Sequence, residues 1–430
     1  MTVRQTVGYV GLGAMGGALA QHLTRGFDLR VLDRNPAAIA ALEAKGALGM
    51  TSGAALGAVC QVVVLCLPRS SDVRAALFDA GGLAEGMAAG SLVIDQTSGV
   101  PAQTAAIAAE LAARGILMLD APVSGGVPAA AAGKVTIMAS GPDAAWAKGA
   151  AVLEGISDKV FRCSDRVGDG QALKLVNNAI GMGFRVAALE LVALGRKAGL
   201  GLAPMVDRLN AGQAANFTTR HMLAGLVEGQ STTNFALSLM AKDLGEAMAL
   251  GLASGAALPF TGAARGLVQT GLAVLGPDAK LDDIIGLTGQ LAQVQMRGDG
   301  GSDPELLVLI ETGVLVGNVI AVSECIAMGR RFGLPADQMA RILNVGSAWC
   351  AVSDMILPAL AKGVVPDLPV SLGQAAAALS ALASLSAQIG TPFTLPGIAL
   401  AFVQEAVRLH GAEASLGCLT FGFEDQSTPG

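Results

Sequence analysis

The chain has 430 residues, of which 52% are hydrophobic and 14% charged, and its formal net charge is −6. This length exceeds what one hydrophobic core usually supports, so two or three domains are expected. The acidic balance and the lack of a basic tract argue against a nucleic-acid-binding protein.

The apolar composition raises the question of a membrane span. Residues 368–404 carry no charged side chain and could cross a bilayer by length, but prolines, glycines and glutamines interrupt them. We interpret this stretch as a helix buried between other helices. The N-terminus has no signal-peptide pattern, and the six cysteines and three histidines show neither disulfide nor metal-site spacing. We therefore predict a cytoplasmic protein with no metal site and no membrane or nucleic-acid partner.

Residues 6–166 alternate short β-type runs with helical patterns. Runs such as "TVGYVG", "DLRVLD", "VVVLCLP" and "SLVIDQT" are separated by amphipathic segments, which is typical of βαβ units and a mainly parallel sheet. From residue 168 onward, long helical segments rich in Ala, Leu, Gly and Met replace the strand signals. The predicted fold is an α/β Rossmann-type N-terminal domain followed by an all-α region.

A glycine-rich turn follows the first predicted strand. In "VGYVGLGAMGG", Gly11 permits a tight turn, Gly13 lets a pyrophosphate approach the backbone, and Gly16 allows close packing of helix and strand. Asp33 ends the next strand, where a carboxylate binds an adenosine ribose and favours NAD. Arg34 beside it could hold a 2′-phosphate, so NADP remains the alternative. A glycine turn formed only for packing would explain the glycines alone.

Three further strand ends are expected at the same edge of the sheet. They are Leu67–Pro68, Thr97, and Ser124 with Gly125 and Gly126. Ligands of open α/β sheets bind at the carboxyl ends of the strands. The Ser-Gly-Gly turn offers a hydroxyl and open backbone N–H groups to a small carboxylate, although an ordinary glycine turn would have the same sequence.

A lysine interrupts the apolar helix predicted at "GQALKLVNNA". Lys174 and Asn178 are four residues apart and so share one helix face. A buried, unpaired ammonium is costly, so this helix face must open onto something polar. A lysine that merely reaches solvent would explain an isolated case, and an active-site acid/base is the functional alternative. A second lysine, Lys242 in "LMAKDLGEA", would need no explanation as part of a surface Lys-Asp pair.

The helical region contains an internal repeat. A shift of 134 residues sets residues 187–212 over 321–346, matching Glu190 with Glu324 and Asn210 with Asn344, and a shift of 133 extends the match to Phe393. We interpret the repeat as two all-α domains related by duplication, joined near the polar stretch 296–305, with chance similarity of Ala-rich helices as the alternative. The predicted domains are 1–166, 167–297 and 298–430.

These stretches together resemble the β-hydroxyacid dehydrogenase family, which includes 3-hydroxyisobutyrate dehydrogenase and tartronate semialdehyde reductase. The matching stretches, "GYVGLGAMGGALA", "LCLP", "DQTSGVP", "DAPVSGGVPAAAAGKVTIMASG", "GDGQALKLVNNA" and "FALSLMAKDL", occur in the family's order from residue 6 to about 275. "DQTS" stands where the family usually has D-x-S-T, which leaves the role of Ser98 less defined than that of Thr97.

The resemblance implies a role for each matching position. Lys174 falls on the catalytic lysine and Asn178 on the asparagine that holds the substrate, while Ser124, Gly125 and Gly126 fall on the loop that binds the substrate carboxylate. Lys242 falls on a lysine that closes over cofactor and substrate. The implied cofactor contacts are Gly11, Gly13, Met15, Gly16, Asp33, Arg34, Leu67, Pro68 and Thr97. Imine reductases share the fold but generally lack the lysine, so Lys174 argues against that group.

The second helical copy departs from the family. Lys174 aligns near Val308, Asn178 near Thr312, and Lys242 and Asp243 near Ala375 and Ala376. The second copy is therefore expected to be catalytically silent and to pack on the first as a dimer partner would. This arrangement resembles the duplicated helical region of 6-phosphogluconate dehydrogenase, and it predicts either a monomer with an internal pseudo-dimer or a homodimer.

The resemblance implies an oxidoreductase that transfers a hydride between NAD(P) and a small 3-hydroxy acid, with Lys174 as general acid/base. One alternative is a catalytically degenerate dinucleotide-binding protein. Another is a decarboxylating sugar-acid dehydrogenase, which would need a cationic cluster for a substrate phosphate. Arg220 and His221 are the nearest pair available for that cluster.

Overall fold

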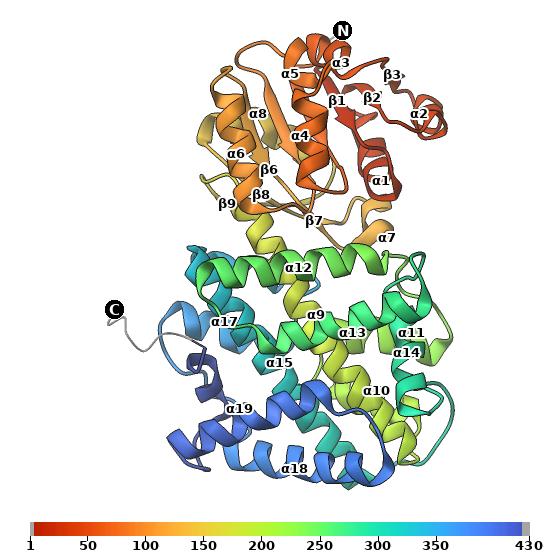
Figure 1. Ribbon diagram of the computed structural model, residues 1–430, viewed down its shortest axis with the longest axis vertical. Helices are drawn as coiled ribbons and strands as arrows, with labels where there is room; N and C mark the ends of the chain where they lie inside the picture. The colour runs from red at the N-terminus through yellow and green to blue at the C-terminus, as the bar shows by residue number, and fades with distance from the viewer. Residues whose placement is uncertain (1–3, 424–430) are drawn as a thin grey trace. The chain divides into compact units, whose positions relative to one another are not determined.

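The computed structural model describes residues 4–423, and the chain forms two compact units, Met1–Lys174 and Leu175–Gly430. The first unit is α/β and the second is helical (Figure 1). The division falls inside one long helix, α9 (Asp169–Lys197). The predicted α/β domain followed by a helical region is confirmed. The predicted border at residue 297 stays a prediction.

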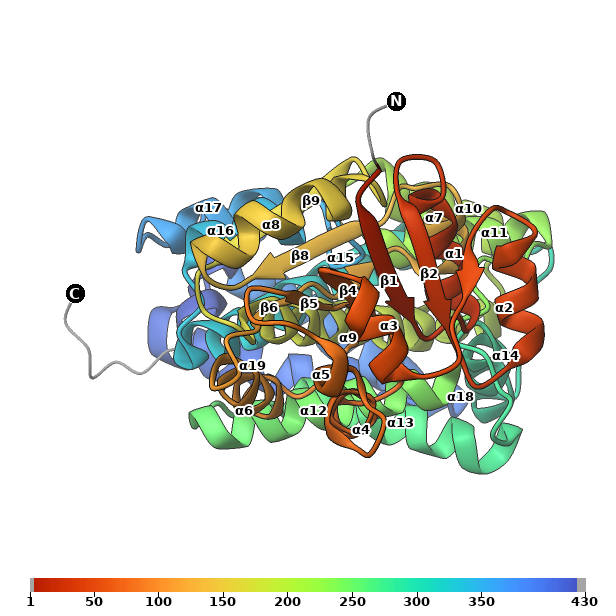
Figure 2. The same ribbon diagram turned by 90° about the horizontal axis from the view of Figure 1, so that it is seen from above.

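The first unit is built on one nine-stranded sheet with the order β3-β2-β1-β4-β5-β6-β8-β7, and β9 pairs with β8 (Figure 2). Strands β1 to β6 pair in parallel, whereas β8 runs antiparallel to both β6 and β7. The strands are β1 (Thr6–Val10), β2 (Asp28–Leu32), β3 (Leu48–Gly49), β4 (Val62–Leu65), β5 (Leu92–Asp95), β6 (Leu117–Asp120), β7 (Val123–Ser124), β8 (Thr136–Ser140) and β9 (Lys159–Ser164). Because β7 points the same way as β6, its carboxyl end lies at the same edge as that of β1.

Helices cover both faces of this sheet. On β4, Val62 and Val64 belong to one buried cluster, while Val63 and Leu65 belong to another, so alternate side chains form a core on each face. Continuous apolar strands are what a sheet buried on both faces requires. The helices are α1 (Ala14–Leu23), α2 (Pro36–Glu43), α3 (Gly53–Val59), α4 (Ser70–Phe78), α5 (Leu83–Gly86), α6 (Pro101–Ala112), α7 (Gly126–Ala131) and α8 (Asp143–Glu154).

The second unit is helical, with isolated bridges in place of strands across its described residues. After α9 the elements are α10 (Leu202–Ala211), η1 (Thr218–Leu223), α11 (Ala224–Glu228), α12 (Leu237–Ser254), α13 (Pro259–Leu275), α14 (Asp283–Ala292), α15 (Pro304–Phe332), α16 (Ala336–Leu343), α17 (Ser353–Ala361), α18 (Leu372–Ile389), α19 (Thr394–His410) and η2 (Leu416–Phe421). Helices α9 and α15 each have 29 residues, α12 and α18 each have 18, and α13 and α19 each have 17.

Helices α9 and α15 approach each other through small residues. A β-carbon placed on Gly183 would lie 2.9 Å from the Ala321 Cβ, and one placed on Gly317 would lie 3.1 Å from the Ala187 Cβ. The two contacts exchange the roles of the helices, as a two-fold axis between them would. A side chain at either glycine would push the helices apart.

Two buried glutamates make a second reciprocal pair of contacts. Glu324 of α15 accepts hydrogen bonds from the backbone N–H groups of Phe260 and Thr261 at the start of α13, both at 2.8 Å. Glu190 of α9 accepts one from the Leu395 N–H at the start of α19 at 2.9 Å. Burial raises the pKa of both carboxyls. Each carboxylate satisfies N–H groups that a helix leaves unpaired at its first turn.

The backbone also pairs between residues 215–217 and residues 349–351. The Phe217 N–H donates to the Trp349 carbonyl at 3.1 Å, and the Ala351 N–H donates to the Ala215 carbonyl at 2.8 Å. These bonds flank an antiparallel bridge between Asn216 and Cys350. The contacts that relate the two halves of the second unit are therefore polar as well as apolar.

Three of the described helices are long and apolar enough to cross a membrane by length and composition alone. They are α9, α15 and α18, and their most apolar windows are 100%, 72% and 33% buried. The prediction of one buried helix within residues 368–404 is wrong in detail. The stretch forms α18 and the start of α19, and α18 exposes a face of small and polar residues that includes Gln374, Ala377, Ala381 and Ser384.

Candidate active site

The glycine loop connects β1 to α1 under tight packing. Gly11 has a φ of +90°, and a β-carbon there would lie 2.3 Å from the Cys66 carbonyl oxygen at the end of β4. A β-carbon on Gly16 would lie 1.9 Å from the Gly11 carbonyl oxygen. Gly13, in contrast, has open space where its side chain would be, and α1 begins there without a side-chain cap. The helix N-terminus is thus accessible to an anionic group.

Asp33 is held against this loop. Its carboxylate accepts hydrogen bonds from the Leu12 N–H at 2.5 Å and from the Asn35 N–H at 2.7 Å. These bonds fix the carboxylate at the end of β2, beside the glycine turn. Arg34 is exposed, and Met15 is half-buried on the first turn of α1.

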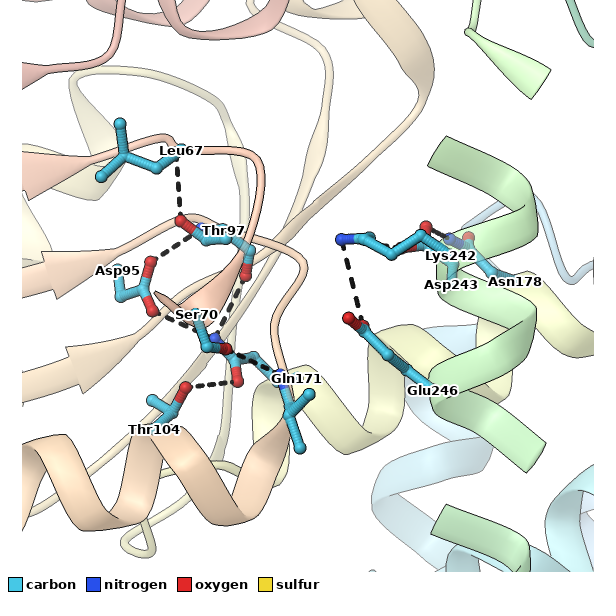
Figure 3. A network of polar contacts seen from close by, with 11 residues as sticks. Leu67, Ser70, Asp95, Thr97, Thr104, Gln171, Asn178, Lys242, Asp243 and Glu246 are labelled. Atoms are coloured by element: carbon cyan, nitrogen blue, oxygen red, sulfur yellow. Dashed lines mark hydrogen bonds and ion pairs between the residues drawn. The ribbon is translucent and has the colours of Figure 1, made fainter. Parts of the chain in front are cut away.

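Two more predicted residues meet at the ends of β4 and β5. The Leu67 N–H donates to the Thr97 hydroxyl at 3.1 Å, and the Thr97 N–H donates to Asp95 at 2.9 Å (Figure 3). A β-carbon on Gly11 would lie 2.9 Å from Leu67. The structure therefore brings together Gly11, Leu67 and Thr97, while Pro68 is exposed and Ser98 is half-buried.

Gln171 ties the start of α9 to this strand edge. Its amide nitrogen donates to Asp95 at 3.1 Å and to the Thr97 carbonyl at 3.2 Å, and its amide oxygen accepts from the Thr104 hydroxyl at 2.7 Å (Figure 3). Gln171 is fully buried and lies three residues before Lys174. This network fixes the first turn of the helix that carries the predicted acid/base.

A buried aspartate completes that anchor. Asp120, at the end of β6, accepts hydrogen bonds from the Gly168 N–H at 2.7 Å and from the Gln171 N–H at 2.8 Å. It therefore acts as a cap for the first N–H groups of α9. Burial is the largest influence on its pKa and raises it to about 8, against the lowering effect of the two hydrogen bonds.

Asp120→Asn is expected to change how stability depends on pH. Near pH 4 the carboxyl starts to ionise in the unfolded chain, whereas in the folded protein it ionises at about 8. Wild-type stability from this group is therefore present below pH 4 and is lost as the pH rises to about 8. The Asp120→Asn variant lacks this titration, but its amide nitrogen faces one of the two N–H groups, of Gly168 or Gln171, that donate to the carboxylate in wild type. Its melting temperature should be lowest relative to wild type near pH 5.

The measurement is the difference in melting temperature between wild type and Asp120→Asn from pH 5 to pH 9. The difference should narrow as the pH rises. Asp143→Asn is the control, because this exposed carboxylate pairs with Arg162 at the surface. A difference that stays constant over the range, as in the control, would contradict the assignment.

The Ser124 loop opens at the same edge of the sheet. Ser124 is buried at the end of β7, and Gly125 and Gly126 follow with φ values of +131° and +75°. Gly125 is exposed, so the backbone turn faces outward. The following helix α7 packs on α1, where His22 Nε2 lies 2.8 Å from the Ala130 carbonyl oxygen. Helices α1 and α7, which follow the glycine loop and the Ser124 loop, therefore pack together.

In the second unit, Asn178 belongs to a buried polar cluster. Its amide donates to Asp243 Oδ2 at 2.6 Å, and the ammonium of Lys242 lies 3.1 Å from Asp243 Oδ1 and 3.9 Å from Glu246 (Figure 3). Asn177 donates to the side chains of Asn178 and Ser347 at 3.1 and 2.9 Å. Asp243 thus holds both Asn178 and Lys242, two of the predicted site residues.

Four residues that hold the predicted positions in place were not predicted as site residues from the sequence. They are Asp95, Asp120, Gln171 and Asp243, each buried and each hydrogen-bonded to or paired with a predicted position or the first turn of α9. Each of the four has a sequence feature that could have indicated its role. Asp95 and Asp120 end apolar strands, and Gln171 lies in the first turn of a helix. Asp243 lies within an apolar helix, where an unpaired carboxylate would be costly.

Two family profiles match the chain. Residues 6–164 match one described as the NAD binding domain of 6-phosphogluconate dehydrogenase. Residues 168–288 match one described as "NAD-binding of NADP-dependent 3-hydroxyisobutyrate dehydrogenase". The two profiles follow each other along the chain and cover the Rossmann unit and the first part of the helical unit.

Characterised relatives agree with the profiles. L-threonate dehydrogenase of Cupriavidus necator is 34% identical over 61% of this chain and 88% of its own length. 2-(Hydroxymethyl)glutarate dehydrogenase of Eubacterium barkeri is 30% identical over 68% of this chain and 97% of its own length. The crystal structure of a 3-hydroxyisobutyrate dehydrogenase from Salmonella typhimurium has a TM-score of 0.60 at 32% identity, and the match covers 66% of this chain and 99% of that one.

The two profiles and the dehydrogenases among the relatives define this chain as an NAD(P)-dependent dehydrogenase. Within that class, the sequence identity and coverage of the relatives determine the family. The chain belongs to the β-hydroxyacid dehydrogenase family, together with the 3-hydroxyisobutyrate and L-threonate dehydrogenases.

Proposed function

We propose that this protein transfers a hydride between NAD(P) and the carbinol carbon of a small 3-hydroxy acid, with Lys174 as general acid/base. The observation that supports this most directly is the placement of Lys174. It is buried on α9, one turn before Asn178, on a helix whose start is fixed by Asp120 and Gln171.

The glycine loop is suited to the cofactor. The open space at Gly13 and the uncapped start of α1 would hold the pyrophosphate, and Asp33 would bind the adenosine ribose. Met15, Leu67, Pro68 and Thr97 would line the same strand edge. NAD(P) supplies the hydride acceptor or donor when it is bound. The chain itself positions the cofactor and excludes alternative orientations.

We propose a preference for NAD over NADP, because the Asp33 carboxylate would repel a 2′-phosphate. Asp33→Ser is expected to weaken NAD binding about tenfold and to bring the kcat/KM values for the two cofactors close together or reverse their order. Arg34 stays available for the phosphate in that variant. Steady-state kinetics with both cofactors provide the check, and an unchanged ratio of the two kcat/KM values would argue against this role of Asp33.

In oxidation, Lys174 would accept the proton of the substrate hydroxyl as the hydride leaves, and in reduction it would return that proton. The side chain of Asn178, whose orientation is fixed by its hydrogen bond to Asp243, would hold the same substrate oxygen or the neighbouring part of the substrate. The Ser124 hydroxyl and the backbone N–H groups at Gly125 and Gly126 would bind the substrate carboxylate. Lys242, fixed by Asp243, would add a positive charge toward the bound anions.

The experiment that tests this function is a panel of small 3-hydroxy acids assayed with NAD and with NADP. Reduced nicotinamide should appear with at least one 3-hydroxy acid and not with the corresponding simple alcohol, which lacks the carboxylate. Cofactor binding without turnover of any hydroxy acid would favour the catalytically degenerate alternative.

We further propose that the helical region is duplicated, with domains 1–166, 167–297 and 298–430, and that the second copy is silent. The matched helix lengths and the reciprocal contacts at Gly183 and Gly317 support this. Gly255 ends α12 and Gly390 ends α18, and the Ala236–Lys280 bridge has a counterpart in Ser371–Ser415. Both comparisons favour aligning α12 with α18 at a shift of 135 residues. Lys242 then falls on Ala377, and Asp243 on Ala378, in place of the predicted Ala375 and Ala376.

The duplication would make the chain an internal pseudo-dimer, either as a monomer or paired again as a homodimer. A cytoplasmic location, with no membrane or nucleic-acid partner, completes the proposal. The sugar-acid alternative gains little from its cationic pair, since the Arg220 guanidinium lies 4.1 Å over the Trp349 ring and His221 packs on Phe217.

A further inference from the structure

A buried arginine on α9 has no role in the site described so far. Arg185 is more than nine-tenths buried, and among the described residues its one hydrogen-bonding contact runs from Nη1 to the Met182 sulfur at 3.6 Å. Its Nε has no hydrogen-bond partner in that part of the chain. Burial lowers the pKa of the guanidinium to about 10. Thioether sulfur is a weak acceptor, so the donors of this side chain are largely unused.

No carboxylate in the described part of the chain forms an ion pair with Arg185. Asp282 is the charge that acts on it, but that carboxylate already accepts hydrogen bonds from the N–H groups of Thr232 and Thr233, at 2.6 and 3.0 Å, and from the Ser231 hydroxyl at 3.0 Å. Its oxygens thus hold the loop before α12. A buried cation left without a partner is costly, and it persists in proteins where function requires it.

Arg185 shares a helix face with the proposed catalytic residues. At 3.6 residues per turn, positions 174, 178 and 185 lie within about 40° of one another around α9. These three side chains keep 8%, 7% and 8% exposure, whereas their neighbours Leu175, Val176 and Met182 keep 1% or less. Gly181 adds no side chain to the strip between Asn178 and Arg185. Before Arg196, these three side chains keep the largest exposed fractions on α9.

The fold does not require an arginine at this position. In α15, the residue that corresponds to Arg185 at the shift of 134 is Val319, which is fully buried. The contacts of Gly183 with Ala321 and of Gly317 with Ala187 join the two helices although α15 has a valine at this position. The charge at position 185 therefore belongs to α9, the helix that carries Lys174 and Asn178, and has no counterpart on α15.

We infer that Arg185 binds a second carboxylate of the substrate, so that the enzyme prefers hydroxy dicarboxylates to hydroxy monocarboxylates. This inference rests on the proposed function. Helical side chains lean toward the N-terminus, and the Met182 contact places the guanidinium about one turn beyond Asn178, roughly 6 Å along the axis. A carboxylate a few bonds from the reacting carbon would reach it. A single guanidinium matches a planar carboxylate through two parallel hydrogen bonds.

The test uses binding, so it does not depend on turnover. Glutarate and pentanoate have the same carbon skeleton and differ in one terminal carboxylate. Their affinities are measured by calorimetry on the full chain with NAD bound, for wild type, Arg185→Met, Arg185→Lys and Arg408→Met. The last is a control, because Arg408 is an exposed side chain paired with Glu405.

Wild type should bind glutarate at least 30-fold more tightly than pentanoate. Arg185→Met should lose this preference while pentanoate affinity stays within threefold, Arg185→Lys should retain part of it, and Arg408→Met should equal wild type. The melting temperature of Arg185→Met should match or exceed that of wild type, since a buried unpaired charge is removed. Equal wild-type affinities for the two acids, or full glutarate binding by Arg185→Met, would overturn the inference.

The same preparations separate this inference from the proposed function. Failure of every hydroxy acid to reduce NAD would count against hydride transfer, whatever the glutarate result. Turnover of 3-hydroxy monocarboxylates with no preference for dicarboxylates would leave the function standing and refute the role of Arg185.

Discussion

Lys174→Ala is expected to lower kcat by about 10³- to 10⁴-fold and to leave NAD(P) affinity nearly unchanged, because it removes a general acid/base and no residue of the dinucleotide loop. The loop at Gly11 to Gly16 is held by β4 and does not depend on the Lys174 side chain. The first turn of α9 is held by Asp120 and Gln171, so the helix should begin at the same place in the variant. Stopped-flow and steady-state kinetics give kcat, and cofactor fluorescence gives the affinity.

Lys197→Ala is the matched control for this experiment. Lys197 lies at the last turn of the same helix, is half-buried, and donates from its ammonium to the Gly390 carbonyl at 2.9 Å. It should retain full turnover. If Lys174→Ala also turned over within a fewfold of wild type, the assignment of Lys174 as acid/base would be wrong.

Truncation after Arg297 is expected to abolish activity and to leave an aggregated or self-associated protein. The face of α9 that contains Gly183, Ala187 and Leu191 would lose α15, and the first N–H groups of α13 would lose the Glu324 carboxylate. Exposure of a large apolar face generally causes association. Size-exclusion chromatography with light scattering reports the assembly state, and the hydroxy acid assay reports the activity.

Supplying residues 298–430 as a separate chain provides the control for misfolding. Co-expression of the two pieces should restore solubility and at least part of the activity, since the contacts between them do not require a covalent link. A truncated protein that is monomeric, soluble and fully active would show that the second helical copy does not pack as a dimer partner.

Much of the first unit could be predicted from the sequence because its signals are local. Strand runs such as β4 and β5 are continuous in Val, Ile and Leu, and the glycine loop follows the first strand directly. Gly11 and Gly16 lie where the backbone leaves no room for a side chain. Lys174 became a candidate through its apolar surroundings together with the family resemblance, and its role stays a prediction.

The supporting residues could not be predicted in the same way, because their partners are distant in the chain. Asp120 acts on Gly168 and Gln171, and Asn178 contacts Asp243 across 65 residues. The reciprocal caps at Glu190 and Glu324 likewise depend on how helices pack. Sequence periodicity places a residue on a face, but the identity of the opposing group requires the fold.

The alanine-rich helices show a second limit. Residues 372–389 consist mostly of Ala, Leu and Ser, so a shift of two positions changes the apparent match very little. Under the proposed duplication, the glycines that end α12 and α18, Gly255 and Gly390, support a correspondence that composition alone does not specify. The same composition concealed that α18 buries only one face, because alanine is compatible with either environment.

The central claim is hydride transfer from a hydroxy acid to NAD(P), and isotope transfer tests it most directly. A 3-hydroxy acid substrate found in the panel is deuterated at its carbinol carbon and incubated with the full-length protein and the oxidised cofactor. We predict deuterium at C4 of the reduced nicotinamide and a primary isotope effect on the chemical step. Release of the deuterium to solvent, or reduced cofactor without deuterium, would contradict the account.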